Sequence, residues 1–134
     1  MDQLRAGVGA KQVVLVVDDD SAVRNSLRFT LEVEGFEVRA YSSAHELLDE
    51  DRLPTLSCLV TDYHMPAMNG LELVAQLRDR HVLIPAILVT SLPNDNLRNR
   101  AAAAGISIVE KPVLGSRLLD FIRNAFDGHI KSPS

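Results

Sequence analysis

The sequence predicts an α/β fold in which a five-stranded parallel sheet has helices on both faces. Five short apolar runs alternate with segments in which apolar residues recur at helical spacing. Three of the runs, at 13–17, 56–61 and 85–90, are largely apolar with little polar alternation, which is typical of strands buried on both faces. Each of four runs also stops at a polar residue. Because parallel strands place their carboxyl ends at one edge of the sheet, we expect a ligand site at that edge.

The first two strand–helix units occupy the first third of the chain. Val13–Val17 is an unbroken β-branched and apolar run, which predicts a buried strand. The apolar spacing then changes to the helical period as far as Gly35, a residue type that commonly ends helices. Phe36–Tyr41 predicts the second strand. Ser43, with Glu46 three residues later, forms a capping-box pattern for a short second helix.

The third unit combines an apolar run with a long polar loop. Leu56–Thr61 predicts a strand that ends at Asp62. Asn69 and Glu72 then have the spacing of a capping box, and leucines and valine at helical spacing follow them. We therefore expect the third helix to begin near Asn69.

The last two units complete the alternation. Pro85–Thr90 and Ile106–Glu110 predict the fourth and fifth strands, the first with its proline where no ladder donor is needed. Asn94–Ala104 has helical composition but a weak apolar stripe, so its helix should be the least firmly packed. Ser116–Phe126 carries apolar residues at helical spacing, and Gly128 predicts the end of that helix.

Length and composition indicate one domain and exclude several function classes. The chain has 134 residues, of which 46% are hydrophobic and 24% charged, as in globular domains. We expect a tail over 1–12, the domain over 13–127 and a second tail over 128–134. The net charge of −4 argues against direct nucleic-acid binding. Because no apolar run is long enough for a membrane span and no secretion signal opens the chain, we expect no membrane contact and a cytoplasmic location.

Polar residues that suit phosphate and metal chemistry stand at the predicted strand ends. They are Asp18 and Asp19, Asp62, Thr90 and Lys111. Three carboxylates at one sheet edge repel one another, so without a cation at least one pKa should rise. A hard divalent cation would remove that conflict.

Mg²⁺ suits this donor set because it prefers oxygen ligands and binds through one or two carboxylates plus phosphate and water. We expect Asp19 and Asp62 to ligate the ion directly. The backbone carbonyl of His64 is a third candidate ligand, and Asp18 is expected to hold a bound water.

The same edge has the parts that phosphoryl transfer requires. A nucleophile must lie in line with the phosphorus, and the equatorial oxygens must be neutralised. We expect Asp62 to be the nucleophile and phosphorylation site, with Lys111 and Thr90 as catalytic residues that hold the phosphoryl oxygens.

Four ordered motifs resemble the receiver domain of two-component response regulators. These motifs are VVDDD at residues 16–20, TDYHMPAMNG at 61–70, LVTS at 88–91 and EKP at 110–112. The amino-acid sequence of these motifs is similar to that of receivers from nitrogen-fixation-type transcriptional regulators. The resemblance covers the chain from about Val13 to Phe126. The resemblance implies the flavodoxin-like (βα)5 receiver fold. It also implies that a histidine kinase or phosphotransfer protein phosphorylates Asp62 with Mg²⁺ as cofactor.

Further features follow from this resemblance. Thr90 would move inward after phosphorylation, a partner or output surface would switch, and the Lys111–Pro112 peptide would be cis. Such a chain would be no classical enzyme, because it would catalyse only its own phosphorylation and dephosphorylation. The receiver interpretation also allows a homodimer formed through the fourth helix and fifth strand.

The chain departs from the receiver pattern at a switch position and varies at two tuning positions. Ile108, three residues before Lys111, stands where the family usually has tyrosine or phenylalanine, which leaves the output route open. His64 and Leu92 lie two residues after Asp62 and Thr90, where receivers tune phosphate lifetime. Leucine could obstruct an attacking water and histidine could orient one, so the sign of the effect stays open.

Three other functions compete with this interpretation. An aspartyl-phosphate phosphohydrolase would share the nucleophile and metal, but the chain has no acid two residues after Asp62 and no cap insertion. A flavin or nucleotide domain would need a glycine-rich first turn, which is aspartate-rich here. A receiver that no longer cycles phosphate is the third. The chain could be a stand-alone receiver or part of a transcription factor or hybrid kinase.

Overall fold

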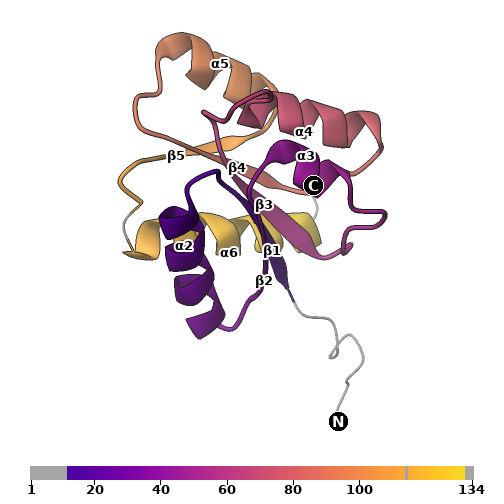
Figure 1. The fold of residues 1–134 in the computed structure, drawn as a ribbon, viewed down its shortest axis with the longest axis vertical. Helices are drawn as coiled ribbons and strands as arrows, with labels where there is room; N and C mark the ends of the chain where they lie inside the picture. Colours follow the sequence, from indigo (N-terminus) through magenta and orange to yellow (C-terminus); the bar gives the residue numbers. More distant parts are fainter. Residues whose placement is uncertain (1–11, 114, 132–134) are drawn as a thin grey trace.

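The structure is a computed structural model in which residues 12–113 and 115–131 are described. Five strands and five helices alternate along these residues (Figure 1). The strands are β1 (Val13–Val17), β2 (Glu37–Tyr41), β3 (Ser57–Asp62), β4 (Ala86–Thr90) and β5 (Ser107–Glu110). The helices are α2 (Ser21–Val33), α3 (Ala44–Leu48), α4 (Gly70–Asp79), α5 (Asp95–Ala103) and α6 (Gly115–Lys131).

All strands are parallel, and they lie side by side in the order β2-β1-β3-β4-β5. The chain therefore moves from β1 outward to β2, then returns to the other side of β1 and continues outward through β3, β4 and β5. The direction of winding reverses between β1 and β3. In such sheets ligands bind beyond the carboxyl ends of the strands at this reversal.

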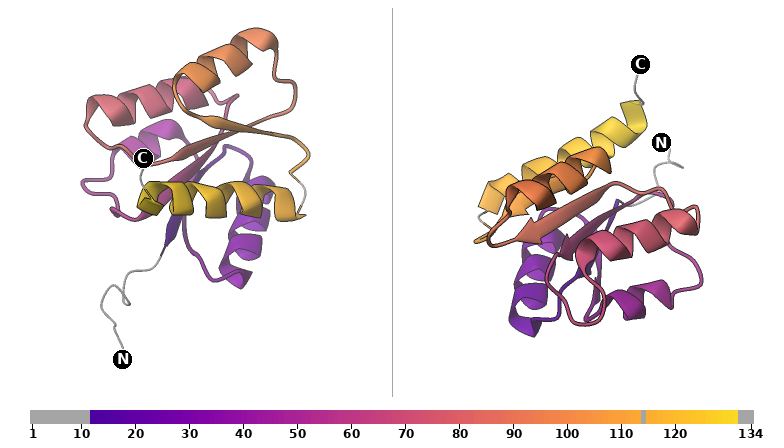
Figure 2. Two further views of the ribbon diagram at one scale, coloured as in Figure 1. Left: turned by 180° about the vertical axis from the view of Figure 1, so that it is seen from behind. Right: turned by 90° about the horizontal axis from the view of Figure 1, so that it is seen from above.

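The helices form one layer on each face of the sheet. Figures 1 and 2 show α2 and α6 on one face and α3, α4 and α5 on the other. Alternate residues of β1 enter the two cores, because successive side chains of a strand point to opposite faces. Val14 and Val16 pack in the core that contains Leu31 of α2 and Phe126 of α6. Leu15 lies in the other core. The predicted fold class is therefore confirmed.

Most predicted boundaries are right within one or two residues, and the predicted stop at Gly35 is confirmed. Gly35 and Gly105 follow α2 and α5 with positive φ angles of 97° and 70°. The predicted stop at Gly128 is wrong, because α6 continues to Lys131. A glycine inside a helix costs about 1 kcal/mol, which is too little to end a helix by itself. The expected domain and tail boundaries stay a prediction.

The capping-box prediction for α3 is half right. The Ser43 side chain accepts a hydrogen bond from the backbone N–H of Glu46, as predicted. The Glu46 carboxylate, however, accepts from the backbone N–H of Ser42 at 2.6 Å instead of closing the box on Ser43. At α4 both bonds between Asn69 and Glu72 are present.

Helix α5 buries little, as its weak apolar stripe predicts. Leu97 and Ala101 are its buried residues. Two polar contacts connect this helix to its neighbours at the surface. Arg98 forms a 3.8 Å ion pair with Glu110, and Arg78 of α4 donates a hydrogen bond to the Ala104 carbonyl. Across the described residues, none of the helices has both the length and the apolar composition that a membrane crossing requires.

Candidate functional site

The sheet itself brings the predicted site residues together. Asp62 and Thr90 are the last residues of β3 and β4, Asp18 follows β1, and Lys111 follows β5. Backbone hydrogen bonds extend the sheet past these ends, for example from the Lys111 N–H to the Thr90 carbonyl at 2.8 Å. The β1–β3 register pairs Val17 with Thr61, which places the residues after β1 beside Asp62.

Three of these residues form an acidic cluster. One carboxylate oxygen from each of Asp18, Asp19 and Asp62 lies within 4.8 Å of the others, and Asp18 and Asp62 are buried while Asp19 is exposed. Burial raises the pKa of Asp18, a hydrogen bond from the Asp20 backbone lowers it, and the nearby charge of Asp62 raises it. The net shift is upward. The cluster therefore offers oxygen ligands to a hard cation, which would relieve the repulsion among its carboxylates.

A cation from the chain itself reaches the same carboxylate. Nζ of Lys111 lies 3.4 Å from Oδ1 of Asp62, and the lysine side chain is 29% exposed. The Lys111–Pro112 peptide bond is cis, as the resemblance implies. The ammonium group thus faces both Asp62 and the solvent-open side of the site, where an incoming anion would arrive.

Thr90 places a hydroxyl without a partner in the interior. The residue is fully buried, and within the described part of the chain its Oγ1 makes no hydrogen bond. Buried hydroxyl groups are nearly always paired, and an unpaired one commonly marks a functional position. Thr90 ends β4, the strand next to the one that carries Asp62.

Gly70 allows the loop after Asp62 to close tightly, and the sequence reasoning missed this. A Cβ at position 70 would lie 2.5 Å from Cδ1 of Leu88 and 2.6 Å from the carbonyl oxygen of Asp62. The Gly70 N–H also donates to the carbonyl of Tyr63 at 3.0 Å. Only a residue without a side chain fits at this close approach. The asparagine cap before Gly70 gave no signal of it.

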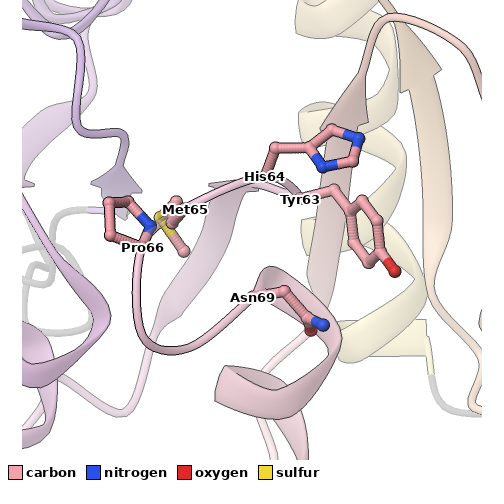
Figure 3. Close-up of a pocket in the computed structure, with 5 residues that line it drawn as sticks. All are labelled: Tyr63, His64, Met65, Pro66 and Asn69. Carbon is pink, nitrogen blue, oxygen red and sulfur yellow. The ribbon is translucent and has the colours of Figure 1, made fainter.

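The remaining part of the β3–α4 loop lines an open pocket of about 390 Å³ (Figure 3). Its residues are Tyr63, His64, Met65, Pro66 and Asn69. The His64 ring is exposed and meets the edge of the Tyr63 ring with centroids 4.7 Å apart. The histidine ring is not among the side chains that form the acidic cluster. Metal ligation by the His64 carbonyl stays a prediction.

The other predicted tuning and switch residues lie at the edge of the site. Leu92 is 83% exposed, so its side chain extends into solvent beyond β4. Ile108 is partly buried and packs against the core on the α3–α5 face. The branched aliphatic side chain fills the place near α5 where the receiver pattern has an aromatic ring.

Comparisons with known proteins agree on one family. The sequence model of the response regulator receiver domain matches residues 14–123. The transcriptional regulatory protein FixJ of Bradyrhizobium diazoefficiens is 35% identical over 115 residues, which is 84% of this chain and 55% of FixJ. The crystal structure of FixJ-N matches with a TM-score of 0.78 at 34% identity, covering 88% of this chain and 95% of that one.

A receiver of Methanospirillum hungatei, described as CheY-like, matches with a TM-score of 0.82 at 29% identity. It covers 91% of this chain and 98% of its own. The chain spans about half the length of the FixJ regulator that it matches. The similarity therefore concerns the receiver domain of these regulators and not their remaining parts.

Proposed function

The chain belongs to the response regulator receiver domain family, and from this premise we propose that it accepts a phosphoryl group on Asp62. Domains of this family are signalling modules of two-component systems and not classical enzymes. The observation that carries the proposal is the 3.4 Å approach of Lys111 to the buried carboxylate of Asp62. The unpaired hydroxyl of Thr90 on the neighbouring strand adds to it.

The proposed step is an in-line transfer. An oxygen of the Asp62 carboxylate attacks phosphorus, the P–N bond of a donor phosphohistidine breaks, and the electron pair of that bond stays on the imidazole nitrogen. Lys111 and Thr90 would bind the phosphoryl oxygens by a charge and a hydroxyl donor. In the return step water attacks phosphorus, the P–O bond to Asp62 breaks with its electron pair left on the carboxylate, and inorganic phosphate leaves with the protons of the water.

The acidic cluster fits Mg²⁺, which receivers generally use. Asp19 and Asp62 are the proposed direct ligands together with the His64 backbone carbonyl, and Asp18 is proposed to hold a metal-bound water. The raised pKa of Asp18, caused first by burial and further by the nearby charge of Asp62, supports this fit because a bound cation would stabilise the buried carboxylate. Bound Mg²⁺ would neutralise charge on the phosphoryl oxygens.

The proposed partners follow from the family. FixJ-type regulators receive phosphate from histidine kinases, so a histidine kinase or a phosphotransfer protein is the proposed donor. We further propose that phosphorylation changes the surface formed by α5 and β5, and that this surface can pair two copies of the chain. The small buried area of α5 supports this choice, since loosely packed elements shift at low cost. With a net charge of −4, we assign this chain no direct contact with nucleic acid.

Phosphorylation by a small acyl phosphate tests the proposal directly. Intact-mass measurement after incubation with Mg²⁺ and acetyl phosphate should show one added phosphoryl group on the wild-type chain. Asp62→Asn should show none, and Asp95→Asn, at the exposed start of α5, is the matched control that should react as wild type does. A wild-type chain that stays unmodified and also does not bind beryllium fluoride would refute the proposal. The remaining interpretation would then be a receiver that no longer cycles phosphate.

A further inference from the structure

Arg24 connects the first helix to the backbone of the acidic cluster. It lies in the second turn of α2, and its Nη1 donates to the carbonyl oxygen of Asp18 at 2.7 Å. The side chain is half-buried, and within the described residues it forms no ion pair with a carboxylate. Its charge is thus directed at one peptide group at the end of β1.

That peptide group is the one from which Asp19 extends. The Asp18 N–H is fixed by the carbonyl of Tyr41 at 3.1 Å, and the Asp18 side chain accepts from the Asp20 N–H at 2.9 Å. The Asp18 carbonyl has Arg24 as its partner. Rotation of the peptide between Asp18 and Asp19 would break this charge-assisted bond, which is stronger than a neutral one.

Asp19 depends on this restraint more than its neighbours do. It is the exposed member of the cluster, and its carboxylate accepts no hydrogen bond from any residue in 12–113. The Asp18 carboxylate, by contrast, is buried and has a backbone donor. The position and Cα–Cβ direction of Asp19 are therefore set by its backbone, and the backbone is held by Arg24.

We propose that Arg24 is a positioning residue for Mg²⁺, which holds the Asp18–Asp19 peptide so that the Asp19 carboxylate points into the cluster. The proposal rests on the proposed function, because it concerns the same metal site. It differs from that function in naming a residue that touches neither metal nor phosphate.

The sign of the effect separates positioning from simple electrostatics. A positive charge near a cation site weakens cation binding, so removing the Arg24 charge would by itself tighten Mg²⁺ binding. If Arg24 instead positions a ligand, its removal should weaken binding despite the lost repulsion. Loss of a residue that orients metal ligands typically costs ten- to a hundredfold in affinity, about the size expected here.

The test is calorimetric titration of the full chain with MgCl₂ near neutral pH. Arg24→Met keeps the apolar stem and removes the guanidinium, and we expect about a tenfold weaker Kd for Mg²⁺. Arg28→Met is the matched control, since Arg28 lies one turn further along α2 and pairs with Glu32 on the exposed surface at 4.0 Å. It removes the same charge from the same helix and should leave Kd unchanged.

A conservative variant and a metal-free measurement complete the test. Arg24→Lys keeps the charge and one donor, so it should bind Mg²⁺ more tightly than Arg24→Met and less tightly than wild type. Thermal unfolding midpoints measured in EDTA show whether each variant folds. If Arg24→Met does not fold, the Mg²⁺ affinities of Arg24→Lys and Arg28→Lys are compared instead, with the same expected direction.

The possible outcomes distinguish the two proposals. Unchanged or tighter Mg²⁺ binding by the Arg24 variant, or an equal loss in the Arg28 control, overturns the role of Arg24 while the phosphate site stands. A wild-type chain that binds no Mg²⁺ contradicts the metal site itself, and with it the positioning role.

Discussion

The ammonium group of Lys111 lies 3.4 Å from Oδ1 of Asp62, and among the ion pairs of the described residues this is the one whose carboxylate is buried. The other pairs join side chains that are about 40% exposed or more, where an ion pair contributes little. Lys111 also remains partly open to solvent. The pair therefore keeps a cation next to the acceptor and accessible to an anionic donor.

Lys111→Ala should impair phosphorylation far more than metal binding. The variant loses the charge that would hold a phosphoryl oxygen, so we expect phosphorylation by acetyl phosphate to slow about 100-fold. Mg²⁺ binding should not weaken, because the three aspartates remain and a positive charge 3.4 Å from Asp62 is removed. Arg98→Ala, which removes a positive charge from an exposed pair on α5, is the control and should react normally. Equal loss of metal binding and phosphorylation in Lys111→Ala would point to misfolding instead.

Asp18→Asn should stabilise the metal-free protein and weaken Mg²⁺ binding. Burial raises the pKa of Asp18 in the folded state above its ordinary value of 3.8. Between the unfolded and folded pKa values the folded state therefore binds more protons than the unfolded state. The free energy of unfolding consequently falls as the pH rises above 3.8. Asparagine removes this cost and can still accept from the Asp20 N–H. Urea unfolding in EDTA near neutral pH should therefore give a higher unfolding free energy for the variant.

The difference should shrink below pH 3.8, where Asp18 is protonated in both states. It should reverse in excess Mg²⁺, because the ion stabilises the wild-type chain more. An asparagine variant that is less stable than wild type in EDTA would show that the Asp18 charge is already compensated.

Gly70→Ala should disturb the acceptor site as well as the fold. The new methyl group would meet Leu88 and the Asp62 carbonyl at 2.5 and 2.6 Å, so β3 or α4 must move. We expect a loss of about 1–3 kcal/mol in unfolding free energy and slower phosphorylation. Gly105→Ala is the control: it meets nothing within 4 Å but has a φ of 70°, so it should cost stability without affecting phosphorylation.

The sequence predicts that the candidate site residues lie together because the order of strands and helices alone implies it. Alternating strands and helices imply a parallel sheet, and a parallel sheet brings Asp62, Thr90 and Lys111 to one edge however far apart they are in the chain. No side-chain packing has to be known for this step. The strand bounds are right within one or two residues for a different reason, because the apolar runs mark them directly.

The residues that support the site were not predictable in this way. Arg24 acts through a side-chain bond to a carbonyl six positions earlier, and surface arginines on helices are common. Gly70 matters because of Leu88, a contact between α4 and β4 that no local pattern encodes. His81 follows the C-cap of α4 in a conformation usually taken by glycine, so no residue type in the sequence signals the end of that helix.

His81→Gly should stabilise the protein. The N–H groups of His81 and Val82 donate to the carbonyls of Arg78 and Leu77 at 2.9 Å each, which is the Schellman pattern, and His81 has a φ of 64°. Gly35 and Gly105 fill the same position after α2 and α5. We expect a gain of about 0.5–1 kcal/mol by urea unfolding, whereas His81→Val, which is β-branched, should lose stability. A destabilised glycine variant would mean that the His81 side chain makes a compensating contact.

Thr90→Val should stabilise the unphosphorylated chain and impair its response to phosphate. The Thr90 hydroxyl is buried without a partner in the described part of the chain, and an unpaired buried hydroxyl costs about 1–3 kcal/mol. Valine has nearly the same shape, so urea unfolding should show a gain of about 1 kcal/mol. The affinity for beryllium fluoride in the presence of Mg²⁺ should fall about tenfold, because the hydroxyl donor to the phosphoryl mimic is gone.

Thr61→Val supplies the matched control with the opposite sign. Thr61 is also fully buried, but its Oγ1 donates to the Asp62 carbonyl at 3.0 Å. Valine there leaves that carbonyl without this donor and should lose about 1 kcal/mol. If both valine variants lose stability, the Thr90 hydroxyl has a partner such as an ordered water in the resting state. Phosphorylation would then have to displace that partner before Thr90 could bind a phosphoryl oxygen.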